Sequence, residues 1–125
     1  MARPLYHLTS PDEPLPHETL DCYRLARELV AWVAARRERL LGLPGEAGPQ
    51  LIRASVRVLL NVAEAAGRTA RRDRARVFGI ARGEACEAGA GIDVAVLFAA
   101  VSREEAAEAR ALVGRLTRML GRLAR

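Results

Sequence analysis

Three polar residues stand among apolar neighbours in the middle of the sequence and are the first candidates for chemistry. Asn61 and Glu64 lie within LLNVAEAAGR, and Arg82 lies within FGIARGEA. A buried carboxylate must be paired or protonated, because an isolated buried charge is very costly. Catalysis would need a histidine or a nucleophile beside it, and none accompanies it. We therefore expect no enzymatic activity and interpret Asn61, Glu64 and Arg82 as a polar clasp that fixes helix register or a subunit contact, with Arg68 as a competing partner of Glu64.

The histidines, cysteines and glycines provide no second kind of reactive site. His7, His17 and Cys22 fit no standard zinc-ligand spacing, so we predict no bound metal. The glycines of FGIARG belong to a helical pattern and follow no strand, which argues against a phosphate-binding loop. Cys22 and Cys86 occupy helical positions that we expect to be half-buried, and we interpret both as free thiols. The sequence therefore predicts no metal and no cofactor.

Arginine supplies all 20 of the Lys+Arg cations, because the chain contains no lysine. Guanidinium groups are planar, bidentate donors that suit phosphate and carboxylate, although codon usage in a GC-rich genome explains the same bias. The formal net charge of +5 permits an anionic partner. Many of the arginines gather in two segments, the stretch 67–76 and the C-terminus. Those that we consider for nucleic-acid binding are Arg68, Arg71, Arg72, Arg74, Arg76, Arg115, Arg118, Arg122 and Arg125.

Apolar residues recur at helical spacing in four segments that must position these side chains. We predict helices over residues 19–41, 49–66 and 70–99, and a fourth that Ser102 caps, with Glu105 completing a capping box. Half of the residues are hydrophobic and only 4% are aromatic, which favours helix over sheet. The short links predict an all-α fold, an up-down-up-down antiparallel four-helix bundle over residues 17–125. Prolines predict an extended or flexible arm over residues 1–16.

Two predicted helices carry more apolar residues than one small bundle needs. The first has a second apolar line, which includes Leu25 and Leu29, beside its core stripe, and helix 49–66 is apolar around most of its circumference. Gly79 and Gly83 form a line with little bulk, which lets another helix approach closely. Surplus apolar surface marks an interface. We therefore expect a homo-oligomer.

The two arginine segments should meet in space. In an up-down bundle the connection at 67–70 lies at the same end as the C-terminus, so the nine arginines share one end, which we call the basic pole. Glu104, Glu105 and Glu108 belong to the opposite end. Helix C-termini favour cations, so solvated arginines explain the pole without a ligand. The alternative is a contact surface for nucleic acid or an acidic protein. Without interleaved aromatic residues, nucleic-acid binding would be led by phosphate contacts.

The N-terminal sequence and the hydropathy pattern indicate the compartment. MARPLYHLTSPDEP has no apolar core of the kind a signal peptide needs. No apolar run approaches the roughly 20 residues that span a bilayer. Together with the free thiols, these features predict a soluble, cytoplasmic protein with no membrane partner.

Several short motifs follow one another at a distinctive spacing. They are Leu20-Asp21-Cys22-Tyr23-Arg24-Leu25-Ala26, Ser55, Asn61-Val62-Ala63-Glu64, Gly67-Arg68, Ile80-Ala81-Arg82-Gly83 and Glu87. Across residues 17–123 the combination resembles the bacterial four-helix-bundle family called 23S ribosomal RNA intervening-sequence proteins. The chain departs from the family pattern at Ala65, where glycine is usual, at Glu84, where a small serine is usual, and at His17, where an aromatic residue often stands.

The resemblance implies a four-helix bundle that assembles as a ring-shaped pentamer, in a family whose members mostly have no assigned activity. One branch, the accessory variability proteins of diversity-generating retroelements, partners a reverse transcriptase and binds nucleic acid. We therefore expect a non-catalytic, oligomeric accessory protein that binds RNA or DNA through the basic pole, with a reverse transcriptase as a candidate partner. A protein–protein interaction scaffold with no nucleic-acid role is the alternative.

Overall fold

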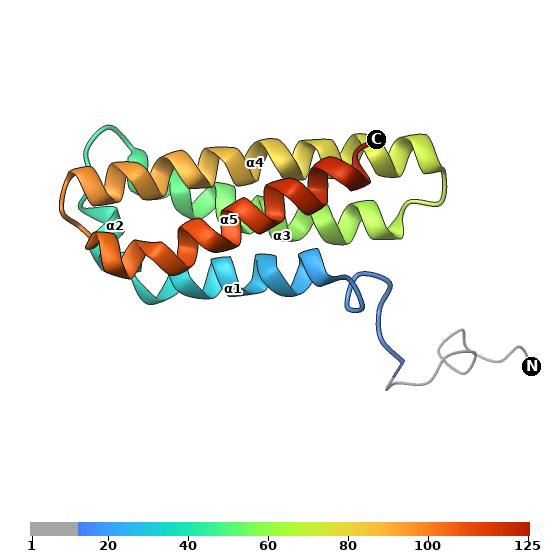
Figure 1. Ribbon diagram of the computed structural model, residues 1–125, viewed down its shortest axis with the longest axis horizontal. Coiled ribbons are helices and arrows are strands. Elements are labelled where there is room, and N and C mark those ends of the chain that lie inside the picture. The colour runs from blue at the N-terminus through green and yellow to red at the C-terminus, as the bar shows by residue number, and fades with distance from the viewer. Residues whose placement is uncertain (1–12) are drawn as a thin grey trace, which may run out of the picture.

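Five α-helices make up the computed structural model over residues 13–125, the part of the chain that the structure describes (Figure 1). Four of them are long and form an antiparallel bundle, and α2 is a short helix of 5 residues. The predicted all-α bundle is confirmed. Residues 1–12, most of the predicted arm, lie outside the described part. The helices are α1 (Asp21–Ala35), α2 (Arg37–Leu41), α3 (Ala47–Gly67), α4 (Arg71–Leu97) and α5 (Arg103–Leu123).

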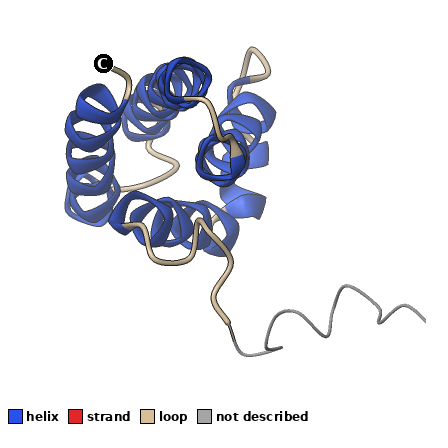
Figure 2. Cartoon of the chain, turned by 90° about the vertical axis from the view of Figure 1, so that its right-hand side faces the viewer, coloured by secondary structure: helices blue, strands red, loops and turns tan. Residues whose placement is uncertain are grey.

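The long helices form a ring in the order α1, α3, α4 and α5, so that each packs against the two beside it (Figure 2). Apolar side chains from all four fill the centre, where Leu29, Val58, Ile92 and Leu116 are completely buried. The ring places the start of α1, the α3–α4 connection and the end of α5 at one end of the bundle (Figure 1). The other end holds α2 and the α4–α5 connection. The chain order alone thus brings together the two arginine segments.

The first predicted helix is interrupted at Arg36, where α1 ends and α2 begins. The φ and ψ angles of Arg36 are −113° and 11°, and its N–H donates to the Val33 carbonyl. Its guanidinium lies over the ring of Trp32, 4.3 Å from the centroid, and binds Glu105 of α5. The prediction of one helix over residues 19–41 was wrong at this residue, because contacts with another helix hold a backbone conformation that the apolar pattern does not reveal.

The two apolar lines of α1 are mostly covered within the chain. Leu25 and Leu29 are completely buried, and Trp32 is 4% exposed. The expectation that this helix has apolar surface to spare was therefore wrong, because α3 and α5 pack against its two sides. Exposed apolar side chains remain on α3, where Val56 is 37% and Leu60 61% exposed. An apolar interface with another subunit would therefore draw on elements other than α1, and α3 is one of them.

Two glycines that the sequence pattern did not single out allow helices to pack closely. A Cβ atom on Gly48 would lie 2.1 Å from the Leu40 carbonyl oxygen, so α3 begins in direct backbone contact with α2. A Cβ on Gly91 would lie 3.0 Å from the side chain of Leu51. By contrast, a Cβ on Gly83 would meet no atom within 4 Å among residues 13–125. No helix of the described chain therefore packs against Gly83, although the sequence predicted a close helix contact along this line of glycines.

Candidate functional site

The α3–α4 connection holds a small ion-pair network at the basic pole. The Arg68 guanidinium donates to Glu64 at 2.5 Å and to Asp73 at 3.1 Å, and Arg76 donates to Asp73 at 2.9 Å. The hydrogen bond to Glu64 raises the pKa of Arg68, and the hydrogen bond from Arg76 lowers the pKa of Asp73. Two of the nine predicted contact residues therefore have their charges matched by carboxylates of the same chain.

The remaining arginines of the pole are unmatched within the described residues. Arg71 and Arg72 are exposed in the first turn of α4, and Arg74 is half-buried there. None of these three, none of Arg115, Arg118 and Arg122 on α5, and not Arg125 beyond it forms an ion pair with a carboxylate of residues 13–125. Seven of the nine predicted arginines thus keep their charge available to solvent or to an anionic partner.

The two arginine groups share one end of the bundle but stand at different heights. Ala124, just beyond α5, lies beside Gly79 of α4, where an added Cβ would be 3.8 Å from the Ala124 Cβ. Gly79 is eight residues after the start of α4 at Arg71, which corresponds to about 12 Å along a helix. The basic pole is therefore stepped, with the α3–α4 connection projecting beyond the end of α5.

Below this step, α4 and α5 border an open surface hollow of about 600 Å³ that is lined by four exposed arginines. Arg82 of α4 crosses toward α5 and its Nε donates to the Thr117 carbonyl at 3.3 Å. The lining residues include no aspartate or glutamate. We call it the arginine hollow, and its residues are Arg82, Thr117, Arg118, Gly121, Arg122, Ala124 and Arg125.

The predicted polar clasp of Asn61, Glu64 and Arg82 does not form within the chain. The ion pair between Arg57 and Glu84, at 4.0 Å, shows the register of α3 against α4. In this register Arg82 lies opposite residue 59, about five residues, or roughly 7.5 Å, from the level of Glu64. Glu64 instead pairs with Arg68 and its side chain is 48% exposed. Asn61 is half-buried and makes no side-chain hydrogen bond to the described residues.

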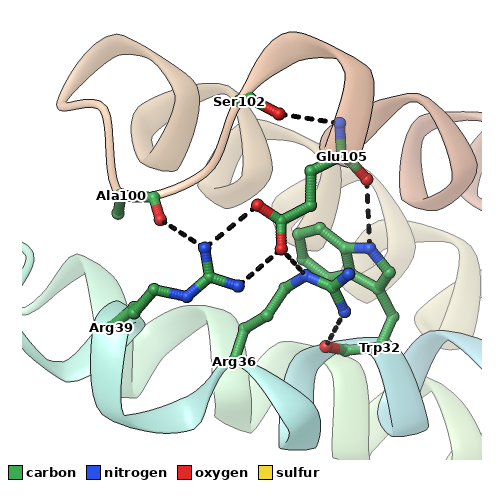
Figure 3. Close-up of polar contacts among 6 residues, drawn as sticks. All are labelled: Trp32, Arg36, Arg39, Ala100, Ser102 and Glu105. Carbon is green, nitrogen blue, oxygen red and sulfur yellow. Dashed lines mark hydrogen bonds and ion pairs between the residues drawn. The ribbon is translucent and has the colours of Figure 1, made fainter.

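At the opposite end, Glu105 of α5 joins α1 and α2 in a cluster that sequence reasoning missed (Figure 3). Its carboxylate accepts from Arg36 Nε at 2.6 Å and from both terminal nitrogens of Arg39, at 3.0 and 2.5 Å. The Trp32 indole N–H donates to the Glu105 backbone carbonyl at 3.3 Å, and Arg39 also reaches the Ala100 carbonyl at 3.1 Å. These bonds tie the α4–α5 connection to the break between α1 and α2.

The same glutamate shows why the capping-box prediction held only in part. Ser102 caps α5, because its hydroxyl accepts from the Glu105 N–H at 3.0 Å. The reciprocal half of a capping box would direct the Glu105 carboxylate back to the Ser102 N–H. The carboxylate binds Arg36 and Arg39 instead (Figure 3). Two arginines supply stronger, charge-assisted hydrogen bonds than one backbone amide.

Family membership follows from a match over most of the chain. A model of the 23S rRNA-intervening sequence protein family matches residues 18–122. The chain belongs to this family. A crystal structure of a protein with unknown function from the S23 ribosomal protein family of Bacteroides thetaiotaomicron has a similar fold, with a TM-score of 0.74 and 17% identity over 83% of this chain and 98% of that chain. No match is found among curated proteins.

The cysteines of this 23S rRNA-intervening sequence family protein differ from each other in environment. Cys22 is buried, and burial raises the pKa of its thiol, whereas Cys86 is exposed on α4. Both are free thiols, as predicted, but the expectation that both are half-buried was wrong.

Within residues 13–125 no three histidine, cysteine or acidic side chains gather as metal ligands would. None of the helices in this region is both long and apolar enough to cross a bilayer.

Acid should lower the stability of this protein, partly because Glu105 becomes protonated. The hydrogen bond from Arg39, opposed by partial burial and helped by Arg36, lowers the pKa of Glu105 from 4.5 to about 2. The folded state therefore binds this proton less readily than the unfolded chain, so the stabilisation is complete above pH 4.5 and is lost as the pH falls toward 2. Glu105→Gln should lower the free energy of unfolding at neutral pH and make its decline in acid shallower. Urea unfolding at a series of pH values measures both.

Glu108 provides the matched control for this prediction. It is exposed on the same helix and forms no ion pair with residues 13–125. Glu108→Gln should keep the acid dependence of the unmodified protein. If Glu105→Gln and Glu108→Gln behave alike in acid, the cluster in Figure 3 does not contribute to stability in solution.

Proposed function

We propose that this protein is a non-catalytic accessory factor that binds nucleic acid through the basic pole. The observation that supports it most is the set of arginines at one end that no carboxylate of the described chain matches, among them Arg71, Arg72 and Arg118. Unmatched guanidinium groups on one surface attract phosphate and release counterions when they bind it. The family name refers to a sequence within ribosomal RNA, which agrees with a nucleic-acid role.

Binding through this pole should depend on phosphate and little on base sequence. The aromatic residue of the first turns of α4, Phe78, is 5% exposed and belongs to the core. The helices that carry the arginines of the pole, α4 and α5, therefore offer no exposed aromatic side chain for base stacking, and the aromatic pair at this end of the bundle is His17 with Tyr23 of α1. A reverse transcriptase is the protein partner that the resemblance to accessory variability proteins suggests, and a neighbouring reverse-transcriptase gene with a variable repeat would favour it.

The salt dependence of binding tests the proposal. Affinity for mixed-sequence RNA or duplex DNA should fall roughly 10³-fold between about 50 and 200 mM salt, if about six phosphates are contacted. Replacing Arg71, Arg72 and Arg74 together with glutamate should weaken binding to all sequences alike by tenfold or more while the helical content stays unchanged. Fluorescence anisotropy with labelled oligonucleotides measures the affinities, and circular dichroism checks the fold.

A charge-matched control uses arginines at the other end of the bundle. Replacing Arg37, Arg53 and Arg103 with glutamate changes the net charge equally, and all three are exposed near the α2 end and form no ion pair with residues 13–125. This variant should lose much less affinity than the pole variant. If neither RNA nor DNA binds at about 50 mM salt, or if both variants bind as well as the unmodified protein, the pole is a solvated helix end.

We also propose that the protein is a homo-oligomer, for which the resemblance favours a pentamer. Val56 and Leu60 of α3 are exposed, and so is Ile80 of α4, which is 44% exposed and lies at nearly the same level as Leu60 in the α3–α4 register. Apolar side chains that share one face favour association. Repetition of the basic pole around an assembly would raise avidity for a long polyanion.

Assembly is measured by light scattering coupled to size exclusion. The unmodified protein should be larger than its monomer mass of 13.6 kDa at micromolar concentration, and Leu60→Glu should reduce the assembly toward monomer. Leu41→Glu, at an exposed position on α2, is the control and should leave the mass unchanged. A monomeric unmodified protein would contradict the proposal.

A protein-binding scaffold is the second candidate. Its support is the α4–α5 connection, where Leu97 is 80% and Phe98 61% exposed. The hydrogen bond from Arg39 to the Ala100 carbonyl fixes the backbone of this connection. The two exposed side chains therefore extend from a backbone of defined conformation. Absence of nucleic-acid binding together with a stable assembly would favour this function over the first.

A further inference from the structure

The arginine hollow differs from the rest of the basic pole in how its side chains are held. Arg82 reaches it from α4, while Arg118 and Arg122 line it from the last turns of α5, and Arg125 lines it from just beyond that helix. The single hydrogen bond of Arg82 uses Nε, which donates to the Thr117 carbonyl. Its two terminal nitrogens make no hydrogen bond to residues 13–125. The guanidinium is therefore oriented by the backbone and still has donors for a ligand.

Gly121 gives Arg82 the room to take this position. A Cβ on Gly121 would lie 3.3 Å from Arg82 Nε and 3.7 Å from its Cδ. Glycine within a helix costs about 1 kcal/mol relative to alanine. At this position it lets a side chain of α4 lie directly against the α5 backbone, at the floor of the hollow. The sequence pattern alone did not connect Gly121 with Arg82.

No acidic side chain of the described residues balances the charges of the hollow. Arg118 and Arg122 are one helical turn apart on α5, and like charges at this spacing repel each other. The lining holds no acidic residue, and none of its four arginines pairs with a carboxylate of residues 13–125. At the α3–α4 connection Arg68 and Arg76 are neutralised by neighbours, which leaves three unmatched arginines there against four at the hollow.

We propose that the arginine hollow binds a phosphate group and is the main phosphate contact of the basic pole. Arg82 of α4 lines the hollow together with three arginines from the C-terminal end of the chain, and several guanidinium groups around one hollow can contact the oxygens of a phosphate together. As a site on a nucleic acid, the hollow rests on the proposed function. The same chemistry would also accept a free polyphosphate, so the two sources of phosphate are separated by experiment.

Two double variants that remove equal charge distinguish the hollow from the connection. Arg82→Gln with Arg122→Gln alters the hollow, and Arg71→Gln with Arg72→Gln alters the start of α4. At about 50 mM salt the hollow variant should bind mixed-sequence RNA roughly tenfold or more weakly, and its salt slope should fall by about 2. The connection variant should lose less affinity. Equal binding by the hollow variant, together with a loss in the connection variant, would overturn the inference and leave the proposed function intact.

A charge-neutral variant and a free polyphosphate complete the test. Gly121→Leu fills the floor of the hollow, keeps the net charge and improves helix propensity, and it should weaken RNA binding. Inorganic tripolyphosphate, followed by calorimetry, should bind the unmodified protein and not the Arg82→Gln, Arg122→Gln variant. If tripolyphosphate binds there and RNA does not, the hollow takes free polyphosphate and the nucleic-acid function fails. If neither binds, both proposals fail.

Discussion

Trp32→Ala is expected to lower the free energy of unfolding by about 3–5 kcal/mol. Trp32 is the single tryptophan of the chain and is 4% exposed, packed between α1 and α5. Its removal leaves a cavity, deprives Arg36 of the ring beneath it and removes the hydrogen bond to the Glu105 carbonyl. Urea unfolding followed by far-ultraviolet circular dichroism measures the change, since the variant has no tryptophan fluorescence.

Trp32→Phe separates the packing of the ring from its hydrogen bond. Phenylalanine keeps most of the apolar contact and loses the indole N–H, so we expect a cost of about 1–2 kcal/mol. If alanine and phenylalanine destabilise the protein equally, packing of the ring is not the main contribution. If alanine costs less than about 1 kcal/mol, the tryptophan is not buried in solution as it is in the structure.

Gly48→Ala is expected to have the second largest effect, a loss of about 2–3 kcal/mol or more. The new Cβ would be placed 2.1 Å from the Leu40 carbonyl oxygen and 2.7 Å from its carbon. Both are backbone atoms, so the clash cannot be relieved by a change of rotamer. The start of α3 must move away from α2, which should disturb the neighbouring Arg36–Arg39 region as well. Thermal and urea unfolding measure the loss.

Gly67→Ala is the matched control for this variant. Gly67 is the last residue of α3, and a Cβ there would meet no atom within 4 Å among the described residues. Alanine is a better helix former than glycine by up to about 1 kcal/mol. The control should therefore be as stable as the unmodified protein or more stable. Equal stability of Gly48→Ala and Gly67→Ala would contradict the close contact between α2 and α3.

The two ends of the bundle use arginine in opposite ways. At the α2 end, Arg36 and Arg39 converge on one glutamate and connect three helices (Figure 3). At the other end, Arg118 and Arg122 line a hollow that has no acidic side chain. At the α2 end a carboxylate of the same chain balances the arginines, whereas at the hollow no acidic side chain balances them. This contrast is the reason for placing a ligand at the basic pole.

The sequence by itself determined the class of fold, the approximate helices and the end at which the arginines gather. Apolar spacing and short links are local properties, so they were enough to predict an antiparallel bundle and to bring residues 67–76 and the C-terminus to one end. Ser102 was recognised as a cap because capping depends on neighbours within one turn. The overall sign of the charge and the absence of lysine were equally visible.

Only the tertiary structure decided which polar side chains meet. Glu64 pairs with Arg68 instead of Arg82, and Glu105 turns from its own cap to Arg36 and Arg39. Arg82 joins the α5 arginines at the hollow. These partners depend on the register and rotation of one helix against another, and a shift of one residue turns a side chain by about 100°. Local periodicity tolerates such a shift, whereas a hydrogen bond between two helices does not.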